Sequence, residues 1–140
     1  MTKQVDYVDW PGRPDVFTPY TPAVRVTGGT TVYFAGVTAA PPYHHHPHRA
    51  EEFDTLPKDM ESQTRAALEN LKKSLESVGA TFEDVVSATV FLTDASDQAA
   101  GRVRREYFGS HRPATTTVEV NRLATDPRCK IEINAVAVID

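Results

Sequence analysis

The sequence predicts an α+β fold in which a mixed sheet carries two helices on one face. Three observations predict it: two stretches with apolar residues every third or fourth position, several runs rich in β-branched residues, and the alternation of the two kinds along the chain. The expected order is β-β-loop-α-β-α-β-β. With 140 residues, of which 40% are hydrophobic, the chain is long enough for one packed core, so residues 1–140 are expected to form a single domain.

The first part of the chain is expected to be irregular up to residue 22, because proline fixes φ and removes a backbone donor. The prolines of this segment are Pro11, Pro14, Pro19 and Pro22. Two β-rich runs follow, residues 23–26 and 31–37, with Gly28 and Gly29 between them. A diglycine between two such runs predicts a hairpin.

Residues 38–58 contain several prolines and no steady period, which predicts a long loop; loops of this length are often lids or binding elements. Residues 60–78 show the stripe of an amphipathic helix, with Asp59 as its N-cap and Gly79 as its stop. The stripe consists of Thr64, Ala67, Leu68, Leu71, Leu75 and Val78. A weaker second helix is expected near residues 99–110, with Arg102, Arg104 and Arg105 on an exposed face, from which one of them could reach across a subunit interface.

Three further strands are predicted, one within "DVVSATVFLTD" (residues 84–94) and two at residues 115–121 and 130–139. The first and last of them are apolar well beyond simple alternation, so both of their faces should be buried. Two helices cover only one face of a sheet. A second copy of the chain is the simplest cover for the other, which predicts a closed homo-oligomer.

Composition narrows the function classes. The 15 basic and 19 acidic residues give a formal charge of −4, and no basic patch is interleaved with aromatic residues, so nucleic acid is not an expected partner. Cys129 is the single cysteine, which leaves no internal disulfide, and we expect it to be structural. No run approaches 18 apolar residues and no signal peptide is recognisable, so we expect no membrane association and a cytoplasmic protein.

Several blocks of the sequence resemble one family. They are "TPYTPAV", "VYFAGV", "QTRAALENLKKSLESVGATFEDVVSATVFLTD", "EYFGSHRPATTTVEVNRL" and "KIEINAVAV". Together they are similar to the Rid family, also called YjgF, whose best-known branch is the enamine/imine deaminase RidA. The resemblance implies a fold similar to bacterial chorismate mutase and a homotrimer with a pocket at each subunit interface. It implies neither a metal nor another cofactor. The proline-rich loop is longer than this family usually has there.

The resemblance implies hydrolysis of small 2-imino acids to 2-keto acids and ammonia. That chemistry needs a cation for the substrate carboxylate, a carboxylate or its water for proton transfer, and backbone groups for the developing charges. In deaminating members an arginine follows Pro-Ala; here Thr115 follows Pro113 and Ala114. The family's acidic residue in the last strand matches Asn134, and Val37 replaces a polar residue. A substrate other than the ordinary 2-imino acids is therefore expected.

The expected catalytic residues are Thr115, Asn134, Glu51 and His46. The expected substrate-binding residues are Tyr20, Gly36, Val37 and Thr117. Each has a plainer interpretation: Tyr20 as packing for the N-terminal segment, the threonines and Asn134 as the wet face of their strands, and the histidine-rich loop as a solvated loop. This loop is "YHHHPHRAEE"; it could also hold a metal, or fold over the pocket and lend it a histidine or glutamate.

Two functional hypotheses follow. The first is an enzyme that hydrolyses C–N bonds of a small organic substrate at interface pockets with deaminase-type chemistry. The alternative is a non-catalytic trimer that binds a metabolite or serves regulation, since the shape of the pocket would survive the loss of its charges. Ribonuclease activity, sometimes attributed to this family, is disfavoured by the acidic balance of the chain.

Overall fold

The computed structural model describes residues 2–12 and 18–140. Its strands are β1 (Gln4–Val8), β2 (Ala23–Thr27), β3 (Thr30–Val37), β4 (Val85–Leu92), β5 (Ala114–Glu119) and β6 (Ile131–Ile139). Its α-helices are α1 (Met60–Glu76) and α2 (Ala99–Phe108), and short 3-10 turns occupy Ala50–Phe53 and Phe82–Asp84.

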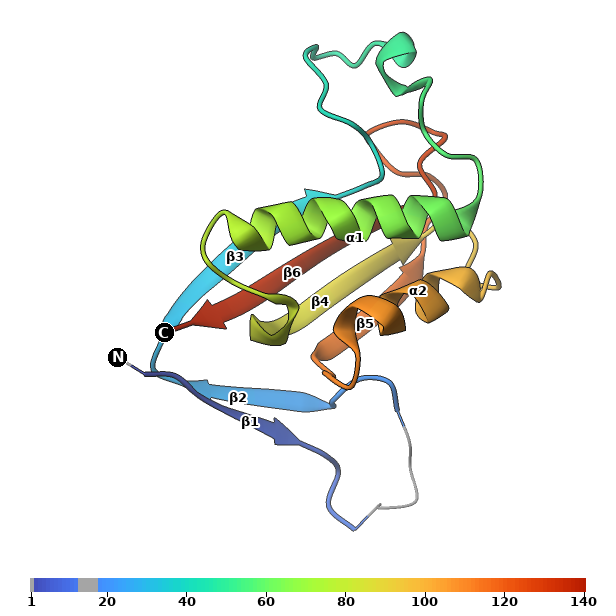
Figure 1. Cartoon of the computed structure of the whole chain (residues 1–140). Helices are drawn as coiled ribbons and strands as arrows, with labels where there is room; N and C mark the ends of the chain where they lie inside the picture. The colour runs from blue at the N-terminus through green and yellow to red at the C-terminus, as the bar shows by residue number, and fades with distance from the viewer. Residues whose placement is uncertain (1, 13–17) are drawn as a thin grey trace.

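The central sheet has four strands in the order β3-β6-β4-β5, and a separate two-stranded sheet pairs β1 with β2. Strands β4 and β5 run parallel, because α2 carries the chain back between them, and the other pairs of the central sheet are antiparallel. Both helices lie on the same face of the central sheet (Figure 1). The predicted α+β class with a mixed sheet and two helices on one face is confirmed.

Two local predictions at the N-terminal end are wrong. Residues 1–22 were expected to be irregular, but Gln4–Val8 forms β1; the part of this segment that includes Pro14 lies outside the described residues. The expected hairpin is also absent, because β2 pairs with β1 whereas β3 pairs with β6. Gly29 has a φ of +76°, and a Cβ there would lie 2.7 Å from the carbonyl oxygen of Ile139. The diglycine therefore turns the chain from one sheet into the other.

Helix α1 forms as its sequence predicts. The Asp59 carboxylate accepts a hydrogen bond of 2.8 Å from the backbone N–H of Ser62, which caps the helix start. The predicted stripe is buried against the sheet at Thr64, Ala67, Leu68, Leu71 and Leu75, while Val78 lies beyond the helix and is 38% exposed. Gly79 follows with a φ of +74°, the left-handed conformation that favours a helix stop at glycine.

The face of the central sheet opposite the helices carries apolar side chains with no cover in the single chain. Register places Tyr33 beside Val136, and the Tyr33 side chain is 79% exposed. Val118 of β5 points to the same face and is 38% exposed, whereas its neighbour Phe91 on β4 is half-buried and packs against the apolar cluster around Phe53 and Leu123. We call this surface the open face. It matches the expectation that a second copy covers the sheet, and the oligomer itself stays a prediction.

Residues 38–58 form a long loop, as predicted, and project beyond one end of the sheet together with residues 120–130 (Figure 1). We call residues 38–58 the arm. The two loops share a small apolar core of their own: Ala39, Phe53, Leu56, Leu123 and Cys129. Burial raises the pKa of the Cys129 thiol, consistent with a packing role.

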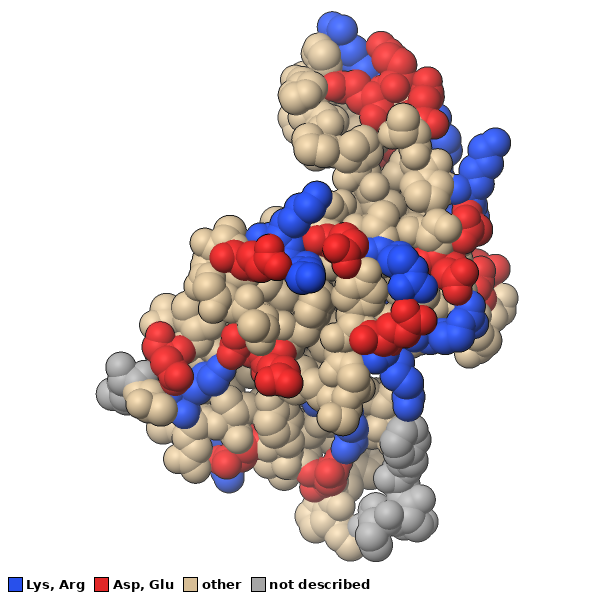
Figure 2. All heavy atoms as spheres, in the orientation of Figure 1, with Lys and Arg blue, Asp and Glu red and all other residues tan. Residues whose placement is uncertain are grey.

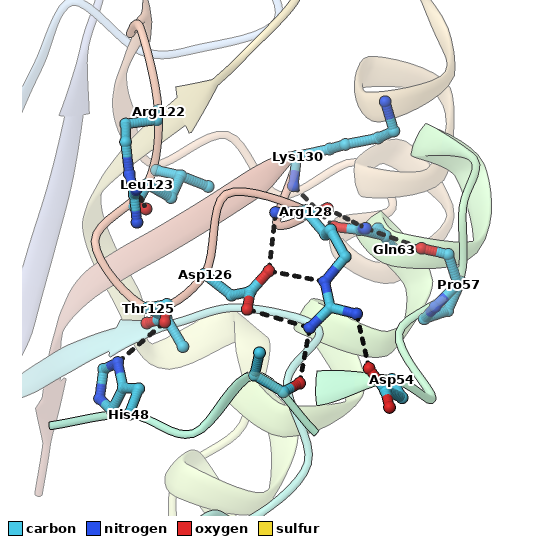
Figure 3. A network of polar contacts seen from close by, with 11 residues as sticks. His48, Asp54, Pro57, Gln63, Arg122, Leu123, Thr125, Asp126, Arg128 and Lys130 are labelled. Atoms are coloured by element: carbon cyan, nitrogen blue, oxygen red, sulfur yellow. Dashed lines mark hydrogen bonds and ion pairs between the residues drawn. The ribbon is translucent and has the colours of Figure 1, made fainter. Parts of the chain in front are cut away.

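Polar contacts fasten the arm to the neighbouring loop (Figure 3). The Arg128 guanidinium donates to the carboxylates of Asp126 and Asp54 and, at 2.7 Å, to the carbonyl oxygen of Ala50. Gln63, fully buried in α1, donates to the carbonyl oxygens of Pro57 and Arg128, each at 2.8 Å. The arm is thus an ordered element rather than a solvated loop.

Candidate functional site

A cavity of about 620 Å³ opens at the start of β5. We call it the cleft. Its wall is the segment 19–22, its floor is formed by the ends of β4 and β5, and Arg104 reaches it from α2. The polar side chains that line it are Tyr20, Thr21, Ser87, Arg104, Thr115, Thr116 and Thr117. Hydroxyl groups and one guanidinium therefore dominate the chemistry of the cleft.

The wall of the cleft is held against β5 by backbone contacts. Thr21 donates from its N–H to the carbonyl oxygen of Pro113 at 3.4 Å and from its hydroxyl to the carbonyl oxygen of Arg112 at 2.5 Å. The Arg112 guanidinium donates to the carbonyl oxygen of Tyr20 at 2.7 Å and pairs with Asp9. Arg112 thus binds the N-terminal segment to the rest of the protomer and positions Tyr20 at the cleft.

Strand register fixes which way the threonines point. Ala88 lies beside Thr115 and Val90 beside Thr117, and both partners are buried beneath the helices. Side chains alternate along a strand and neighbours in register share a face, so Thr115 and Thr117 point to the helical side. Thr116 points to the open face. The Thr115 hydroxyl donates a hydrogen bond of 3.0 Å to the carbonyl oxygen of Pro113.

Arg104 does not lie on an exposed helix face, contrary to the sequence expectation. Arg102 and Arg105 are exposed, but Arg104 is half-buried and turned toward β5. Burial lowers the pKa of its guanidinium, and among the described residues it makes no ion pair or hydrogen bond. A buried cation without a partner is unusual, because desolvation of a charge is costly unless the charge is paired.

A second cavity, of about 760 Å³, lies between α2 and the sheet and shares Arg104 with the cleft. We call it the groove. Its apolar lining includes Ala88, Val90, Phe108 and Ile133. Neither the cleft nor the groove has an aspartate or glutamate in its described lining. In a chain of net charge −4, this local absence of carboxylates makes both cavities electropositive.

The open face holds a second polar centre. Gly36 lies against Glu132: a Cβ at Gly36 would be 2.5 Å from the Glu132 carboxylate oxygen Oε2. Asn134, two residues along β6, accepts a hydrogen bond of 3.2 Å from the backbone N–H of Thr89. The sequence analysis expected no carboxylate beside the pocket glycine, because it matched the acidic position to Asn134. In the structure Glu132 occupies this place, and Val37 follows Gly36 with its side chain half-buried.

The expected site residues are not brought together within one chain. Thr115 is level with Ala88, whereas Glu132 is level with Phe91, three residues further along β4. With about 3.3 Å per residue and 4.8 Å per strand, their backbones are about 14 Å apart. Asn134 does not line the cleft and faces the opposite side of the sheet from Thr115. The cleft and the Gly36–Glu132 pair are therefore two separate parts of the protomer.

His46 and Glu51 lie on the arm, which projects away from the start of β5 (Figure 1). The His46 ring packs on Tyr43 and on His48, with centroid distances of 5.5 and 4.7 Å. Within the arm the His45 ring nitrogen Nδ1 instead lies 3.0 Å from the Glu52 carboxylate, and this hydrogen bond lowers the pKa of the Glu52 carboxyl. In the described part of the chain no group of three His, Cys, Asp or Glu side chains could hold a metal.

The surface that carries the helices shows mixed charge. Figure 2 shows basic and acidic side chains interspersed over the helical side, without a broad basic surface. This arrangement does not favour nucleic acid on that side. No helix within the described ranges is long and apolar enough to cross a membrane.

Comparison with known proteins identifies the family. Residues 11–139 match the sequence family described as Endoribonuclease L-PSP. A RutC family protein of Pyrococcus abyssi is 36% identical over 138 residues, which are 98% of each chain. The chain belongs to the Rid family. Members of the Rid family also carry the names YjgF and RutC.

Solved structures of Rid proteins have the same fold. A YjgF/YER057c/UK114 family member from Mycobacterium tuberculosis is 31% identical, with a TM-score of 0.64, covering 97% of this chain and 100% of its own. The Rid protein YyfB of Yersinia pestis is 26% identical, with a TM-score of 0.73 and coverages of 99% and 100%. TdcF of Escherichia coli, crystallised with bound serine, is 29% identical, with a TM-score of 0.65 and coverages of 89% and 91%. TdcF is provisionally named a reactive intermediate deaminase.

Two residues of the site were missed by the sequence analysis. Glu132 stands in an alternating run with Lys130 and Asn134, in which no single position is distinctive. Arg104 stands between two other basic residues of the same helix. Helical period does not single it out, because Arg102 and Arg104 both lie one position from the buried Val103, about 100° around the helix, and Arg102 is exposed.

Proposed function

We propose that this Rid protein adds water to the C=N bond of a small imine, or of the imine tautomer of an enamine, and releases ammonia. The observation that carries the proposal is the Glu132 carboxylate placed against Gly36 on the open face. A carboxylate in this position can take a proton from water as the water oxygen bonds to the imine carbon. The proton is returned to the nitrogen, which gives a carbinolamine. Its hydroxyl proton then passes to the nitrogen as the C–N bond breaks and the C=O bond forms, so that ammonia and a carbonyl product leave.

The proposed active unit is a homotrimer in which each pocket forms between two protomers. Support comes from the uncovered apolar side chains of the open face, Tyr33 above all. Since Thr115 and Glu132 are about 14 Å apart in one chain by strand geometry, a neighbour is needed to bring a cleft and a Gly36–Glu132 pair together. Tyr20, Thr115 and Thr117 would come from one protomer; Gly36, Val37, Glu132 and Asn134 would come from the next.

The arm provides a further proposed contribution. Its projection beyond the sheet would let His46 or Glu51 approach a pocket of a neighbouring protomer, although neither reaches the cleft of its own chain (Figure 1). Both residues stay candidates for acid or base in the assembled trimer. The firm attachment of the arm through Arg128 and Gln63 supports a fixed role over a mobile lid.

Turnover of a freshly generated 2-imino acid, followed by ammonia release above the buffer rate, tests the reaction. Glu132→Gln should lower the rate at least about a hundredfold, in the range of losses seen for general acid–base groups. Glu76→Gln, at an exposed position near the end of α1, is the matched control and should retain the wild-type rate. Equal rates for both variants would exclude Glu132 from the reaction.

The alternative is a trimer that binds a metabolite without turnover. It is motivated by the family resemblance, which implies an arginine where this chain has Thr115. A neutral hydroxyl contributes about 1 kcal/mol to a hydrogen bond, against about 1.5–3 kcal/mol for a charged donor. A thermal-shift series with 2-keto acids would support this alternative if ligands raise the midpoint and no imine is hydrolysed.

A further inference from the structure

The cleft contains a cation that no described residue of the protomer neutralises. The Arg104 guanidinium is half-buried, borders both cavities and has no hydrogen-bond or ion-pair partner in the described ranges 2–12 and 18–140. The other arginine at the cleft wall, Arg112, already donates to Tyr20 and pairs with Asp9. Arg104 is therefore the cation in this region that is free to bind a ligand.

The surroundings of Arg104 match an anion of single charge. The described linings of the cleft and the groove contain no carboxylate that would repel an anion. The Thr117 hydroxyl, which points to the same side of the sheet as Thr115, stands in the cleft and can donate to the oxygens of the anion. A guanidinium binds a carboxylate through two parallel charge-assisted hydrogen bonds, and one such cation balances one carboxylate.

The groove provides space for the rest of the ligand. It begins at Arg104 and runs beneath α2 over the buried side chains of Ala88, Val90 and Ile133, with Phe108 at its side. The groove is also lined by Arg102, Arg105 and Arg112, but Arg102 pairs with Glu61, Arg112 pairs with Asp9, and Arg105 has an interaction of its own. Arg104 is thus left as the anchor for a charged group next to the apolar part of the lining, an arrangement that favours ligands with an apolar body beside a charge. Pyruvate-sized molecules would leave most of the 760 Å³ unfilled.

We propose that Arg104 is the anion-binding residue of this protein and that the groove beneath α2 holds the apolar side chain of a carboxylate ligand. The guanidinium on α2 thus takes the role that Thr115 cannot fill. The reaction on such a ligand rests on the proposed function; the binding does not. An imine derived from an amino acid with a large apolar side chain is the corresponding substrate class.

Isothermal titration calorimetry of the full chain with stable probes tests the binding directly. Phenylpyruvate carries both a carboxylate and an aromatic ring, pyruvate lacks the ring, and phenylacetone has a methyl group where phenylpyruvate has its carboxylate. Wild-type protein should bind phenylpyruvate more tightly than either of the others. Arg104→Met should weaken phenylpyruvate about ten- to a hundredfold, the range for a lost charged hydrogen-bond donor, and leave phenylacetone unchanged.

Two further variants make the result decisive. Arg65→Met removes an exposed arginine of α1 that pairs with Glu106, away from both cavities, and should leave phenylpyruvate binding unchanged. Arg104→Lys keeps the charge without the planar fork and should recover part of the affinity. Thermal midpoints of all variants show that each is folded.

The outcomes separate this inference from the proposed reaction. Arg104-dependent phenylpyruvate binding without imine turnover would support the inference and count against the proposed function. Equal phenylpyruvate affinity in wild type and Arg104→Met would overturn the inference even if imines are hydrolysed. A variant that loses oligomer mass in light scattering while its protomers still bind phenylpyruvate normally would also overturn it, because Arg104 would then pair with a neighbouring subunit.

Discussion

The contact between Gly36 and Glu132 shows how one missing methyl group can shape a site. The three atoms nearest to a Cβ built at Gly36 all belong to the Glu132 side chain, at 2.5, 3.0 and 3.1 Å. Any other residue at position 36 would push the carboxylate aside. Glycine is therefore required here for close approach rather than for backbone conformation.

Gly36→Ala should displace the Glu132 carboxylate and lower imine hydrolysis at least about tenfold, if Glu132 is the proton acceptor. The free energy of unfolding should fall by only about 0.5–1.5 kcal/mol, because the end of a flexible side chain can leave its preferred rotamer at that cost. Urea unfolding and ammonia release measure the two effects.

A double-mutant cycle provides the control. The Glu132→Ala variant lacks all three side-chain atoms that lie close to a Cβ at position 36. In that background Gly36→Ala should therefore change the free energy of unfolding by close to nothing. An equal cost in both backgrounds would contradict the contact as the cause.

Site residues were predictable from the sequence only where a local pattern distinguishes them. Tyr20 and Thr115 were expected at one place and do line the same cleft. Arg104 was misplaced because three arginines within four positions of one helix resemble a solvated face. Its true position depends on how α2 rolls over β5, which is a property of tertiary packing and not of helical period alone.

Among the elements, the arm differs most from an ordinary connection. It carries a small apolar core and a polar network centred on Arg128 (Figure 3). Asp126 is 6% exposed and accepts from both the N–H and the guanidinium of Arg128. These contacts, first the side-chain hydrogen bond from Arg128, hold the pKa of the Asp126 carboxyl below its usual 3.8.

Asp126→Asn should lower the thermal midpoint at pH 7 because it removes the charge that Arg128 binds. The pKa of Asp126 is lower in the folded than in the unfolded protein, so its contribution is complete above the unfolded value of about 3.9 and is lost as pH falls through the folded value. Calorimetric midpoints of wild type and variant should therefore converge as pH falls from about 7 to below 3.9.

Asp54→Asn is the matched control for this pH series. Asp54 bonds the same guanidinium, but its side chain is 66% exposed, so its removal should shift the midpoint much less. A difference between wild type and Asp126→Asn that stays constant down to the lowest pH would show that the carboxylate charge is not the cause.

The regular elements follow from the sequence to different degrees. The first residue of helix α1 was predicted correctly, because the signals for it, the N-cap Asp59 and the leucine stripe, are local in the sequence. Strand β1 was missed because "QVDYV" has half-exposed, mixed side chains and precedes several prolines. The error at Gly28 and Gly29 has another cause: a turn sequence shows that the chain reverses or bends, but not which strands then pair.

At the scale of the whole molecule, the open face is exposed in the single protomer and would be covered in the proposed trimer. Its exposed side chains would cost hydration free energy in a monomer, since each Å² of apolar surface left in water forgoes roughly 25 cal/mol. Exposed apolar residues on both edge strands, Tyr33 on β3 and Val118 on β5, spread this surface across the sheet. The apolar character of both strand faces predicted this uncovered surface from the sequence. The residues themselves do not indicate how many protomers are needed to cover it.

Tyr33→Glu should convert the proposed trimer into monomers, because three carboxylates would be buried without partners at the interface. Light scattering coupled to size-exclusion chromatography measures the mass of wild type and variant. Val78→Glu places the same charge at an exposed apolar position beyond α1 and should leave the mass unchanged. A wild-type mass of one protomer would refute the trimer and with it the shared pocket.

The strand order β3-β6-β4-β5 leaves β5 at the border of the sheet, where segment 19–22 covers only its beginning. The outward peptide groups of the β-branched run Thr116–Val118 form a template to which a foreign strand can add. A chain kept from its proper assembly would thus risk fibrous aggregation. High yields of protein refolded from denaturant would then require low concentration, so that correct association outpaces strand addition.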